Sequence, residues 1–376
     1  MIPPKALLQQ LRSERVSFFT GVPDSLLKHF CSYVTDCAHG TDEHVIAANE
    51  GGAIALATGH YLATGEYALV YMQNSGLGNA VNPLLSLADP EVYSIPMLLM
   101  IGWRGEPGRH DEPQHVKQGR VTLDLLQAME MPYVILEATA VDWQQVVGSA
   151  CRQMRERQGP VAIVVKAGAF EPYERADGGP VERLLTREQA IGIILDELDE
   201  EDIIVSTTGQ TSRELFELRE ARAQRHDSDF LTVGSMGHSN QTALGISLRK
   251  PDRQVLCLDG DGSVLMHTGG LAIVGQMAPA NFKHVVLNNE AHDSVGGQPT
   301  ASSNVDFAGL ARATGYRYVA RASERHEVQN AVRQMMQEEG PCFLEVRVKK
   351  GARKDLGRPT NTPLANRNDL MKGLLR

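Results

Sequence analysis

The chain has 376 residues, a formal net charge of −9 at pH 7 and a 42% share of hydrophobic residues. This length predicts two or three domains with enough apolar side chains for a large core. The acidic balance argues against a nucleic-acid partner, which would require a basic stripe, but it is compatible with a local basic pocket for an anionic substrate. No apolar run approaches the ~20 residues that cross a membrane, and the five cysteines form no C-x-x-C pair. We therefore expect a cytoplasmic protein without a membrane partner and with buried, reduced thiols.

Strands and helices alternate through the first half of the chain. A polar amphipathic helix is predicted over 4–14, and an alanine- and glycine-rich helix over 50–63. Short apolar runs predict strands at 16–20, 44–48, 67–72, 97–101, 133–135 and 161–166. Strands separated by helices imply right-handed crossovers, and therefore a doubly wound parallel sheet.

The second half repeats this alternation. Apolar runs predict strands at 203–206, 230–233, 255–258, 284–287, 318–320 and 342–348. A helix is expected over 264–276. The two halves share this plan, but no fixed-period sequence repeat relates them.

A charged segment with prolines and glycines separates the two halves. We therefore predict an α/β protein with two doubly wound parallel-sheet domains. The predicted bounds are 1–170 for the first domain, 171–184 for the linker, 185–350 for the second domain and 351–376 for a C-terminal tail. The sequence leaves open whether the tail is mobile or clasps a partner subunit.

The most informative motif lies in the second half. Gly260-Asp261-Gly262-Ser263 follows one predicted strand, and Asn288-Asn289 follows the next. The carboxyl ends of parallel strands meet at the edge where ligands bind, and carboxylate and amide oxygens suit Mg²⁺. A lone Gly-Asp-Gly is usually only a turn, and a lone Asn-Asn often only caps a helix. The complete strand–turn–helix–strand–Asn-Asn unit indicates a diphosphate and metal site.

A second candidate site lies at the start of the helix predicted over 50–63. Glu50 opens this helix and is followed by Gly51, Gly52 and other small residues. One interpretation is an acid favoured by the helix macrodipole, with glycines that permit tight packing. The functional interpretation is a buried glutamate that faces a closely approaching ring.

Taken together, the two sites resemble those of the thiamine-diphosphate-dependent 2-oxo acid decarboxylases. In that family the N-terminal domain binds the aminopyrimidine and the C-terminal domain binds the diphosphate. Many larger members carry a third domain between them, where this chain has only the short linker. The cofactor acts as an electron sink, and the resemblance assigns Glu50 to the glutamate that holds a proton on the pyrimidine N1′. Family active sites lie between two chains, which implies a homodimer or a higher homo-oligomer.

The resemblance also assigns the residues around the cofactor. The backbone carbonyl of Gly234 would accept a hydrogen bond from the 4′-amino group, and Met236 would support the bent cofactor. The alternative for Met236 is a simple core filler. The remaining cofactor-binding residues would be Gly209, Gln210, Thr211, Ser212, Gly262 and Ser263.

The same resemblance implies a Mg²⁺ site in the second half. Its ligands would be the side chains of Asp261 and Asn289 and the backbone carbonyl of Ala291. Asn288 is the less expected ligand of the two asparagines.

A narrower resemblance spans nearly the whole chain. The segments at 21–28, 71–83, 102–108, 111–120 and 291–300 are similar to the branch of the family that decarboxylates 3-phosphonopyruvate to phosphonoacetaldehyde and CO₂ in phosphonate biosynthesis. A sister branch acts on sulfopyruvate and is often split into two subunits.

This narrower resemblance implies an anionic 2-oxo acid as the substrate. The loop at 102–120 carries Arg104, His115, Lys117 and Arg120, and Ser25 belongs to the same expected substrate site. Arginine would offer a bidentate fork to a phosphonate, and lysine a point charge. The alternative is a solvated basic loop that is balanced by neighbouring acids.

Three residues are candidates for the proton donor. Asp24 and His115 occupy positions where related decarboxylases keep an acid and a histidine, and they rank ahead of His292. Larger pyruvate decarboxylases carry a glutamate six residues after the metal asparagine, where this chain has Val295. Asp24 could instead cap a helix, and His292 could serve as a turn donor.

Three other functions compete with this interpretation. One is a sulfopyruvate decarboxylase or a carboligase. Another is a non-catalytic nucleotide-binding module, but Gly76-Leu77-Gly78 lacks the third glycine of the dinucleotide fingerprint. The third is a subunit that supplies one half-site, which is disfavoured because Glu50 and Asp261 occur on one chain.

Overall fold

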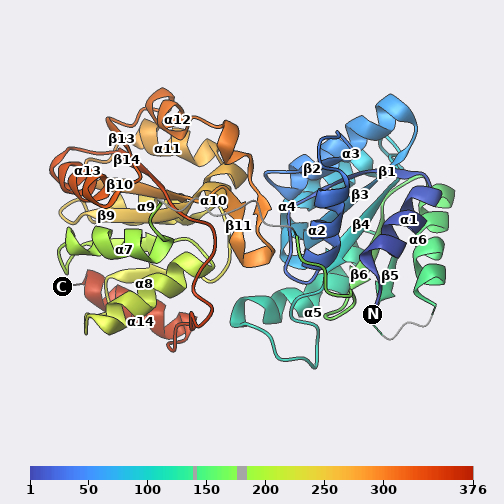
Figure 1. The fold of residues 1–376 in the computed structure, drawn as a ribbon, viewed down its shortest axis with the longest axis horizontal. Helices are drawn as coiled ribbons and strands as arrows, with labels where there is room; N and C mark the ends of the chain where they lie inside the picture. Colours follow the sequence, from blue (N-terminus) through green and yellow to red (C-terminus); the bar gives the residue numbers. More distant parts are fainter. Residues whose placement is uncertain (139–141, 176–183, 376) are drawn as a thin grey trace. The chain divides into compact units, whose positions relative to one another are not determined.

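The structure is a computed structural model that describes residues 1–138, 142–175 and 184–375. The chain divides into two compact units, Met1–Gly178 and Gly179–Arg376. Within the described residues, each unit contains a six-stranded parallel sheet with helices on both faces (Figure 1). This confirms the α/β fold class with two doubly wound sheets. Most of the predicted linker, at 176–183, lies outside the described residues, so the predicted domain bounds stay predictions.

The first unit contains all the strands that the apolar runs predicted there. Its strands are β1 (Val16–Gly21), β2 (His44–Ile46), β3 (Tyr67–Gln73), β4 (Met97–Gly102), β5 (Tyr133–Leu136) and β6 (Val161–Val165), in the spatial order β2-β1-β3-β4-β6-β5. Its helices are α1 (Pro4–Ser13), α2 (Lys28–Cys37), α3 (Glu50–Thr64), α4 (Leu77–Pro83), α5 (Pro113–Ala128) and α6 (Trp143–Arg157). The order reverses beside β1, as in other doubly wound sheets.

Two apolar clusters fill the two faces of this sheet. Helices α1, α2 and α6 cover one face, where Leu69 of β3 is buried. Helices α3, α4 and α5 cover the other face, where Val70 is buried. Successive side chains of a strand point to opposite faces of the sheet. Because both faces are buried, the residues on each face must be apolar. This explains why β3 and β4 form continuous hydrophobic runs.

The second unit repeats the arrangement. Its sheet has the order β13-β14-β10-β9-β7-β8, with β7 (Ile203–Ser206), β8 (Asp229–Leu231), β9 (Val255–Gly260), β10 (Phe282–Asn288), β13 (Tyr318–Ala322) and β14 (Cys342–Arg347). Its helices are α7 (Arg187–Asp196), α8 (Gln210–Ala221), α9 (Ser239–Ser247), α10 (Asp261–Met266), α11 (Gly269–Met277), α12 (Phe307–Ala313), α13 (Arg325–Gln337) and α14 (Pro363–Leu374). A hairpin of β11 (Ala291–His292) and β12 (Gln298–Pro299) was not predicted.

The helix predicted over 264–276 is two helices, α10 and α11, so that prediction was wrong in its continuity. His267 interrupts it with φ −136° and ψ 56°, which is not a helical conformation. The hydroxyl of Thr268 donates to the carbonyl of Val264 at 3.1 Å and so satisfies one carbonyl at the end of α10.

The cysteines follow the prediction with one exception. All five are free, and Cys31, Cys151, Cys257 and Cys342 are buried. Cys37 is the last residue of α2 and is exposed, so the expectation of buried thiols was wrong for this residue. Among the described residues, no helix combines the length and apolarity that a membrane crossing requires.

The C-terminal segment packs against its own unit. Helix α14 lies next to β8, and its buried Asn366 bridges to that strand. The Asn366 side chain accepts from the N–H of Leu231 at 3.0 Å and donates to the carbonyl of Asp229 at 2.8 Å. This segment therefore completes the core of the second unit, a role that neither interpretation of the tail included.

We predict that Asn366→Ala lowers the free energy of unfolding by about 1–3 kcal/mol, because it leaves two buried backbone groups without a partner. Asn368→Ala in the same helix is the control, since Asn368 accepts only from the neighbouring Arg367 among the bonds of the described chain. Denaturant unfolding measures both variants. Equal stabilities would contradict a structural role for the α14 contact.

Candidate active site

The candidate residues of the first unit gather at the carboxyl edge of its sheet. Asp24 follows β1, Glu50 follows β2, Gln73 ends β3 and Arg104 follows β4. These strands are neighbours in the order β2-β1-β3-β4. Parallel pairing therefore brings side chains that are distant in sequence to one edge, as expected for a ligand site.

Glu50 is the first residue of α3 and is only 5% exposed. The side chain of Asn49 caps this helix by accepting from the N–H of Gly52 at 2.8 Å. Burial raises the pKa of Glu50, and the Asn79 amide, which donates to its Oε2 at 2.8 Å, opposes this rise. A Cβ on Gly76 would lie 2.3 Å from Glu50 Oε1, so a glycine is required beside the carboxyl group. A buried carboxyl with a raised pKa is typical of a functional site.

Asp24 is fully buried on the turn after β1. Burial raises its pKa, against hydrogen bonds from Gln73 Nε2 to Oδ1 at 2.7 Å and from the N–H of Leu26 to Oδ2 at 2.9 Å. A Cβ on Gly102, at the end of β4, would lie 2.1 Å from Asp24 Oδ2. The bond to Leu26 is a local turn interaction and not a helix cap, because α2 has Leu27 at its N-cap and no side-chain cap, so the capping alternative was wrong. The bond to Gln73 ties Asp24 to β3.

Arg104 and Ser25 come together, as the substrate-site prediction required. Arg104 Nη1 donates to Ser25 Oγ at 2.9 Å. Its Nε and Nη2 form a bidentate pair with the carboxylate of Asp111, at 2.8 and 2.5 Å. The Asp111 bonds raise the pKa of Arg104. The guanidinium is thus held in place and partly neutralised by an acid of its own segment.

The second part of the cationic segment is a helix, so its description as a loop was wrong for 113–120 but not for 103–112, which contains Arg104. Helix α5 begins at Pro113, a residue well suited to the first helical turn. Burial, and secondarily Arg104, lower the pKa of His115 to about 4, so its ring is neutral near pH 7. Its Nδ1 is buried without a hydrogen-bond partner in the described chain. Lys117 is exposed on the same helix.

In the second unit, Asp261 and Asn289 adjoin each other at the carboxyl edge. Asp261 opens α10 and is buried, which raises its pKa. Its carboxylate accepts from the hydroxyls of Thr300 and Ser302, each at 2.6 Å. The backbone N–H groups of Gly262 and Asn289 also bond to it and oppose the rise.

The two asparagines after β10 have different surroundings. Asn288 is buried and donates to Glu345 Oε1 at 2.8 Å, so its amide is engaged within the sheet. Asn289 Nδ2 donates to Asp293 Oδ2 at 2.6 Å, and its Oδ1 accepts from the N–H of Ala291 at 3.1 Å. These contacts are compatible with the prediction that Asn289, rather than Asn288, is the metal ligand.

His292 lies close to the Gly-Asp-Gly turn. A Cβ on Gly262 would lie 3.1 Å from the His292 ring, so glycine permits this approach. Burial lowers the pKa of His292 to about 4, which leaves its ring neutral near pH 7.

The predicted diphosphate segment opens α8. Gly209 precedes this helix with φ +95°, a conformation that favours glycine. The hydroxyl of Ser212 donates to the carbonyl of Thr207 at 2.7 Å, so its proton is engaged internally. Gln210 Oε1 accepts from Arg187 Nη2 at 2.6 Å. Thr211 is buried in the same turn.

The segment after β8 has an irregular backbone. Ser235 and Gly237 have φ values of +53° and +88°. The N–H of Gly237 donates to Ser263 Oγ at 3.1 Å, which links this segment to the Gly-Asp-Gly-Ser turn. Met236 and Gly234 are partly exposed within their unit, so Met236 is not a simple core residue. Its support of the cofactor stays a prediction.

Sequence reasoning missed several residues that hold these groups. They are Gln73, Asn79, Arg187, Thr207, Asp293, Thr300 and Ser302. Some lie in segments that carried the family resemblance, such as 71–83 and 291–300. The sequence signal that could have revealed some of these residues is a cluster of polar residues shortly after a predicted strand.

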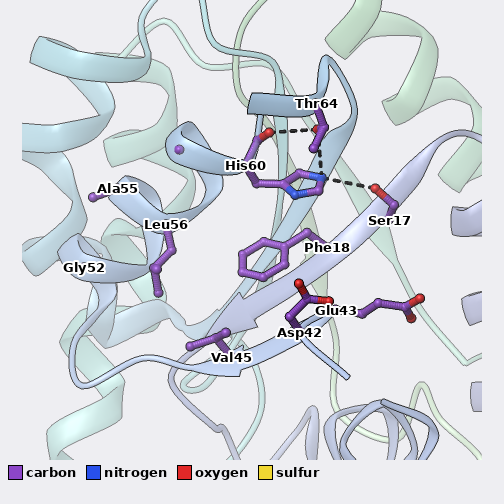
Figure 2. A pocket seen from close by; sticks show the side chains of 11 residues that line it. Ser17, Phe18, Asp42, Glu43, Val45, Gly52, Ala55, Leu56, His60 and Thr64 are labelled. Atoms are coloured by element: carbon purple, nitrogen blue, oxygen red, sulfur yellow. Dashed lines mark hydrogen bonds between the residues drawn. The ribbon is translucent and has the colours of Figure 1, made fainter. Parts of the chain in front are cut away.

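A hollow of about 870 Å³ in the first unit lies apart from these residues. Phe18, Val45 and Leu56 form apolar parts of its wall, and His60 Nε2 lies 3.1 Å from Ser17 Oγ (Figure 2). Ser17 is near the amino end of β1, and His60 is in the second half of α3. The predicted site residues do not line this hollow.

Two family descriptions match the chain, one in each unit. The thiamine pyrophosphate enzyme N-terminal TPP binding domain matches residues 4–128, and the C-terminal TPP binding domain matches residues 207–346. The chain therefore belongs to the thiamine pyrophosphate enzymes, and it is a thiamine-diphosphate-dependent decarboxylase.

The chain is also similar to named decarboxylases over nearly their whole length. The chain is 37% identical to phosphonopyruvate decarboxylase from Streptomyces viridochromogenes, over 96% of this chain and 92% of the relative. It is 36% identical to phosphonopyruvate decarboxylase from Streptomyces hygroscopicus over the same shares. It is 26% identical to sulfopyruvate decarboxylase from Methanosarcina acetivorans, over 93% of this chain and 92% of the relative.

We predict that Gly76→Ala destabilises the protein by about 1–3 kcal/mol and weakens thiamine diphosphate binding, because the new methyl group would overlap Glu50. Gly78→Ala is the matched control, since a Cβ there has no neighbour within 4 Å in the described chain. Denaturant unfolding and calorimetric titration with the cofactor measure both effects. Similar behaviour of the two variants would contradict the close packing around Glu50.

Proposed function

We propose that this enzyme converts 3-phosphonopyruvate to phosphonoacetaldehyde and CO₂ and serves phosphonate biosynthesis. The observation that carries the proposal is the 36–37% identity, over almost the whole chain, to two enzymes named phosphonopyruvate decarboxylase. The full-length relative named sulfopyruvate decarboxylase is only 26% identical. A sulfopyruvate decarboxylase or carboligase is therefore the second candidate.

The residues of the second unit fit a Mg²⁺ ion and a diphosphate. Asp261, Asn289 and the carbonyl of Ala291 would supply oxygen ligands, which Mg²⁺ prefers. The start of α8, from Gly209 to Ser212, together with Gly262 and Ser263, would bind the diphosphate. Because the Ser212 hydroxyl already donates to the Thr207 carbonyl, the backbone N–H groups and the Thr211 hydroxyl would be the donors to the diphosphate in this turn.

The residues of the first unit fit the other end of the cofactor. The raised pKa of Glu50 favours a protonated carboxyl group, as the proposed contact with the pyrimidine requires. The carbonyl of Gly234 and the side chain of Met236, in the second unit, would complete the cofactor contacts. When bound, thiamine diphosphate supplies the electron sink for decarboxylation.

Asp24 is the best candidate for the proton donor. Its raised pKa lets it keep a proton at a higher pH than an exposed aspartate. His115 and His292 have pKa values of about 4, so both are neutral near pH 7 and are better suited to accept a hydrogen bond than to donate a proton as an acid. This ranks Asp24 ahead of His115 and keeps His292 third.

Arg104 would recognise the phosphonate together with Ser25, His115 and Lys117. Arg104 is already fixed by Asp111 and Ser25, which lowers the entropy cost of ordering it around a substrate. A doubly ionised phosphonate carries more charge than a sulfonate, so a fixed Arg104 together with the exposed Lys117 would favour the phosphonate.

We also propose a cytoplasmic homodimer or higher homo-oligomer. Relatives named sulfopyruvate decarboxylase subunit beta and subunit alpha align with 46% and 44% of this chain, respectively. One chain thus carries counterparts of both subunits, and two chains would supply two active sites.

The proposed reaction is tested with purified protein, thiamine diphosphate and Mg²⁺. We expect 3-phosphonopyruvate to give phosphonoacetaldehyde and CO₂ far faster than sulfopyruvate or pyruvate react. Phosphorus NMR and CO₂ release measure the first reaction, and aldehyde release measures the other two. Faster turnover of sulfopyruvate would show that sulfopyruvate, and not 3-phosphonopyruvate, is the substrate. Failure to convert any of the three compounds would favour a carboligase.

Arg104→Ala is expected to raise the KM for 3-phosphonopyruvate by about tenfold or more relative to pyruvate, because charged hydrogen bonds contribute roughly 1.5–3 kcal/mol. Arg109→Ala is the control, since Arg109 is exposed in the same segment and pairs with Glu106. Steady-state kinetics with both substrates give the comparison. Equal losses for the two substrates would remove Arg104 from phosphonate recognition.

A further inference from the structure

We infer that Asp293, held by Arg187, is a positioning residue that orients the amide of Asn289 with its oxygen toward the metal. The inference deepens the proposed function and rests on the proposed Mg²⁺ site. It assigns a role to two residues that touch neither substrate nor metal in that proposal.

An asparagine amide can present either an oxygen or an NH₂ group to a metal, and only the oxygen is a ligand. A carboxylate beside the amide removes this ambiguity because an ionised carboxylate only accepts hydrogen bonds. Asn289 Nδ2 donates to Asp293 Oδ2 at 2.6 Å. The NH₂ group is therefore fixed on the Asp293 side. Oδ1 accepts from the N–H of Ala291 at 3.1 Å and has a second lone pair for the ion.

Asp293 is itself held from two further directions. Its Oδ2 also accepts from Arg187 Nη1 at 3.3 Å and from the N–H of Gly351 at 2.8 Å. The side chains of Arg187 and Asp293 are only 6% and 9% exposed. Bonds between charged groups are stronger in such a poorly solvated place than in water.

Arg187 is anchored independently of Asp293. It forms a bidentate pair with Glu214 of α8, at 2.7 and 3.0 Å, and the Glu214 side chain is 2% exposed. Its Nη2 also donates to Gln210 Oε1 at 2.6 Å, at the start of α8. One guanidinium thus connects the predicted diphosphate turn to the predicted metal turn.

The cluster of Arg187, Glu214 and Asp293 has one cation and two acids. An excess negative charge beside the metal turn favours a divalent cation. The arrangement resembles that of other metal sites, in which each ligand is oriented by a neighbouring group. Loss of the neighbouring group typically weakens metal binding 10–100-fold.

A purely structural role is the competing explanation. Loss of a fold-supporting contact would lower stability and weaken the cofactor equally at every metal concentration. Loss of an orienting contact would weaken metal binding itself, and an exchange of donor and acceptor between the two side chains would restore it. The two explanations therefore differ in readouts other than activity.

The first test is Asp293→Asn in the full-length protein. The new amide can donate to Asn289 Oδ1 and so favour the wrong orientation. We expect about 10–100-fold weaker Mn²⁺ binding in the presence of thiamine diphosphate, measured by the loss of the free Mn²⁺ electron paramagnetic resonance signal. Calorimetric titration should show that cofactor affinity recovers as Mg²⁺ is raised. Unchanged Mn²⁺ affinity would overturn the inference.

The second test is the exchange double variant Asp293→Asn/Asn289→Asp. The new amide can then donate to the new carboxylate, whose two oxygens are equivalent, so no orientation is wrong. We expect most of the Mn²⁺ affinity to return. If the double variant binds as weakly as Asp293→Asn, the orientation argument fails.

Glu290→Gln is the matched control, because it removes one negative charge from the same turn but pairs outward with Arg347. We expect Mn²⁺ affinity within about twofold of the wild type. A loss as large as that of Asp293→Asn would show that only charge matters, which overturns the inference.

Asp293→Ala gives the same information if Asp293→Asn does not fold, and we expect a smaller metal-specific loss from it. These measurements contain no substrate, so they are independent of the phosphonopyruvate assignment. A wild-type protein that binds thiamine diphosphate without a metal would overturn this inference and leave the decarboxylase assignment standing.

Discussion

The parallel pairing of β9 with β10 is the constraint on which the second unit depends. Leu287 pairs with Gly260 in this register, so Asp261 and Asn289 leave the sheet side by side at its carboxyl edge. A slip of one residue would turn every side chain of a strand to the opposite face. Because both faces of this sheet are covered by apolar clusters, the core fixes the register. The position of the candidate metal ligands therefore follows from core packing, before any metal is bound.

Burial of polar groups is costly unless each finds a partner, and this cost explains many residues around the edges. Thr300 and Ser302 satisfy Asp261, Asn79 satisfies Glu50, and Gln73 satisfies Asp24. Gly76 and Gly102 leave space where any larger side chain would displace a carboxyl group. The glycines and the amides therefore act together. The glycines let the chain pack closely around each carboxyl group and bury it, and the amides supply the hydrogen bonds that the buried group needs.

The sequence predicted the fold well because continuous apolar runs are characteristic of buried parallel strands. It also singled out Glu50 and Asp261 as candidates, since each lies within three residues of the end of a predicted strand. It did not reveal their partners: Thr300 lies 39 residues from Asp261 and Asn79 lies 29 from Glu50, and such pairings follow from tertiary contacts. Local features also misled, since the Pro113 helix was expected as a loop and the break at His267 carries no proline.

Three buried carboxyl groups show how one fold can prepare acids for different tasks. Burial is the largest influence on the pKa of Asp24, Glu50 and Asp261, and it raises all three. Their hydrogen bonds differ: Asp261 accepts from two hydroxyls and two backbone N–H groups, Asp24 accepts from Gln73 and two backbone N–H groups, and Asn79 supplies the side-chain bond to Glu50. Each donor favours the ionised form, so the four bonds to Asp261 suit a cation, whereas Glu50 has fewer donors to oppose the effect of burial. The surroundings of each group, rather than its residue type, therefore distinguish Asp261, the proposed metal ligand, from Glu50, the proposed contact of the pyrimidine.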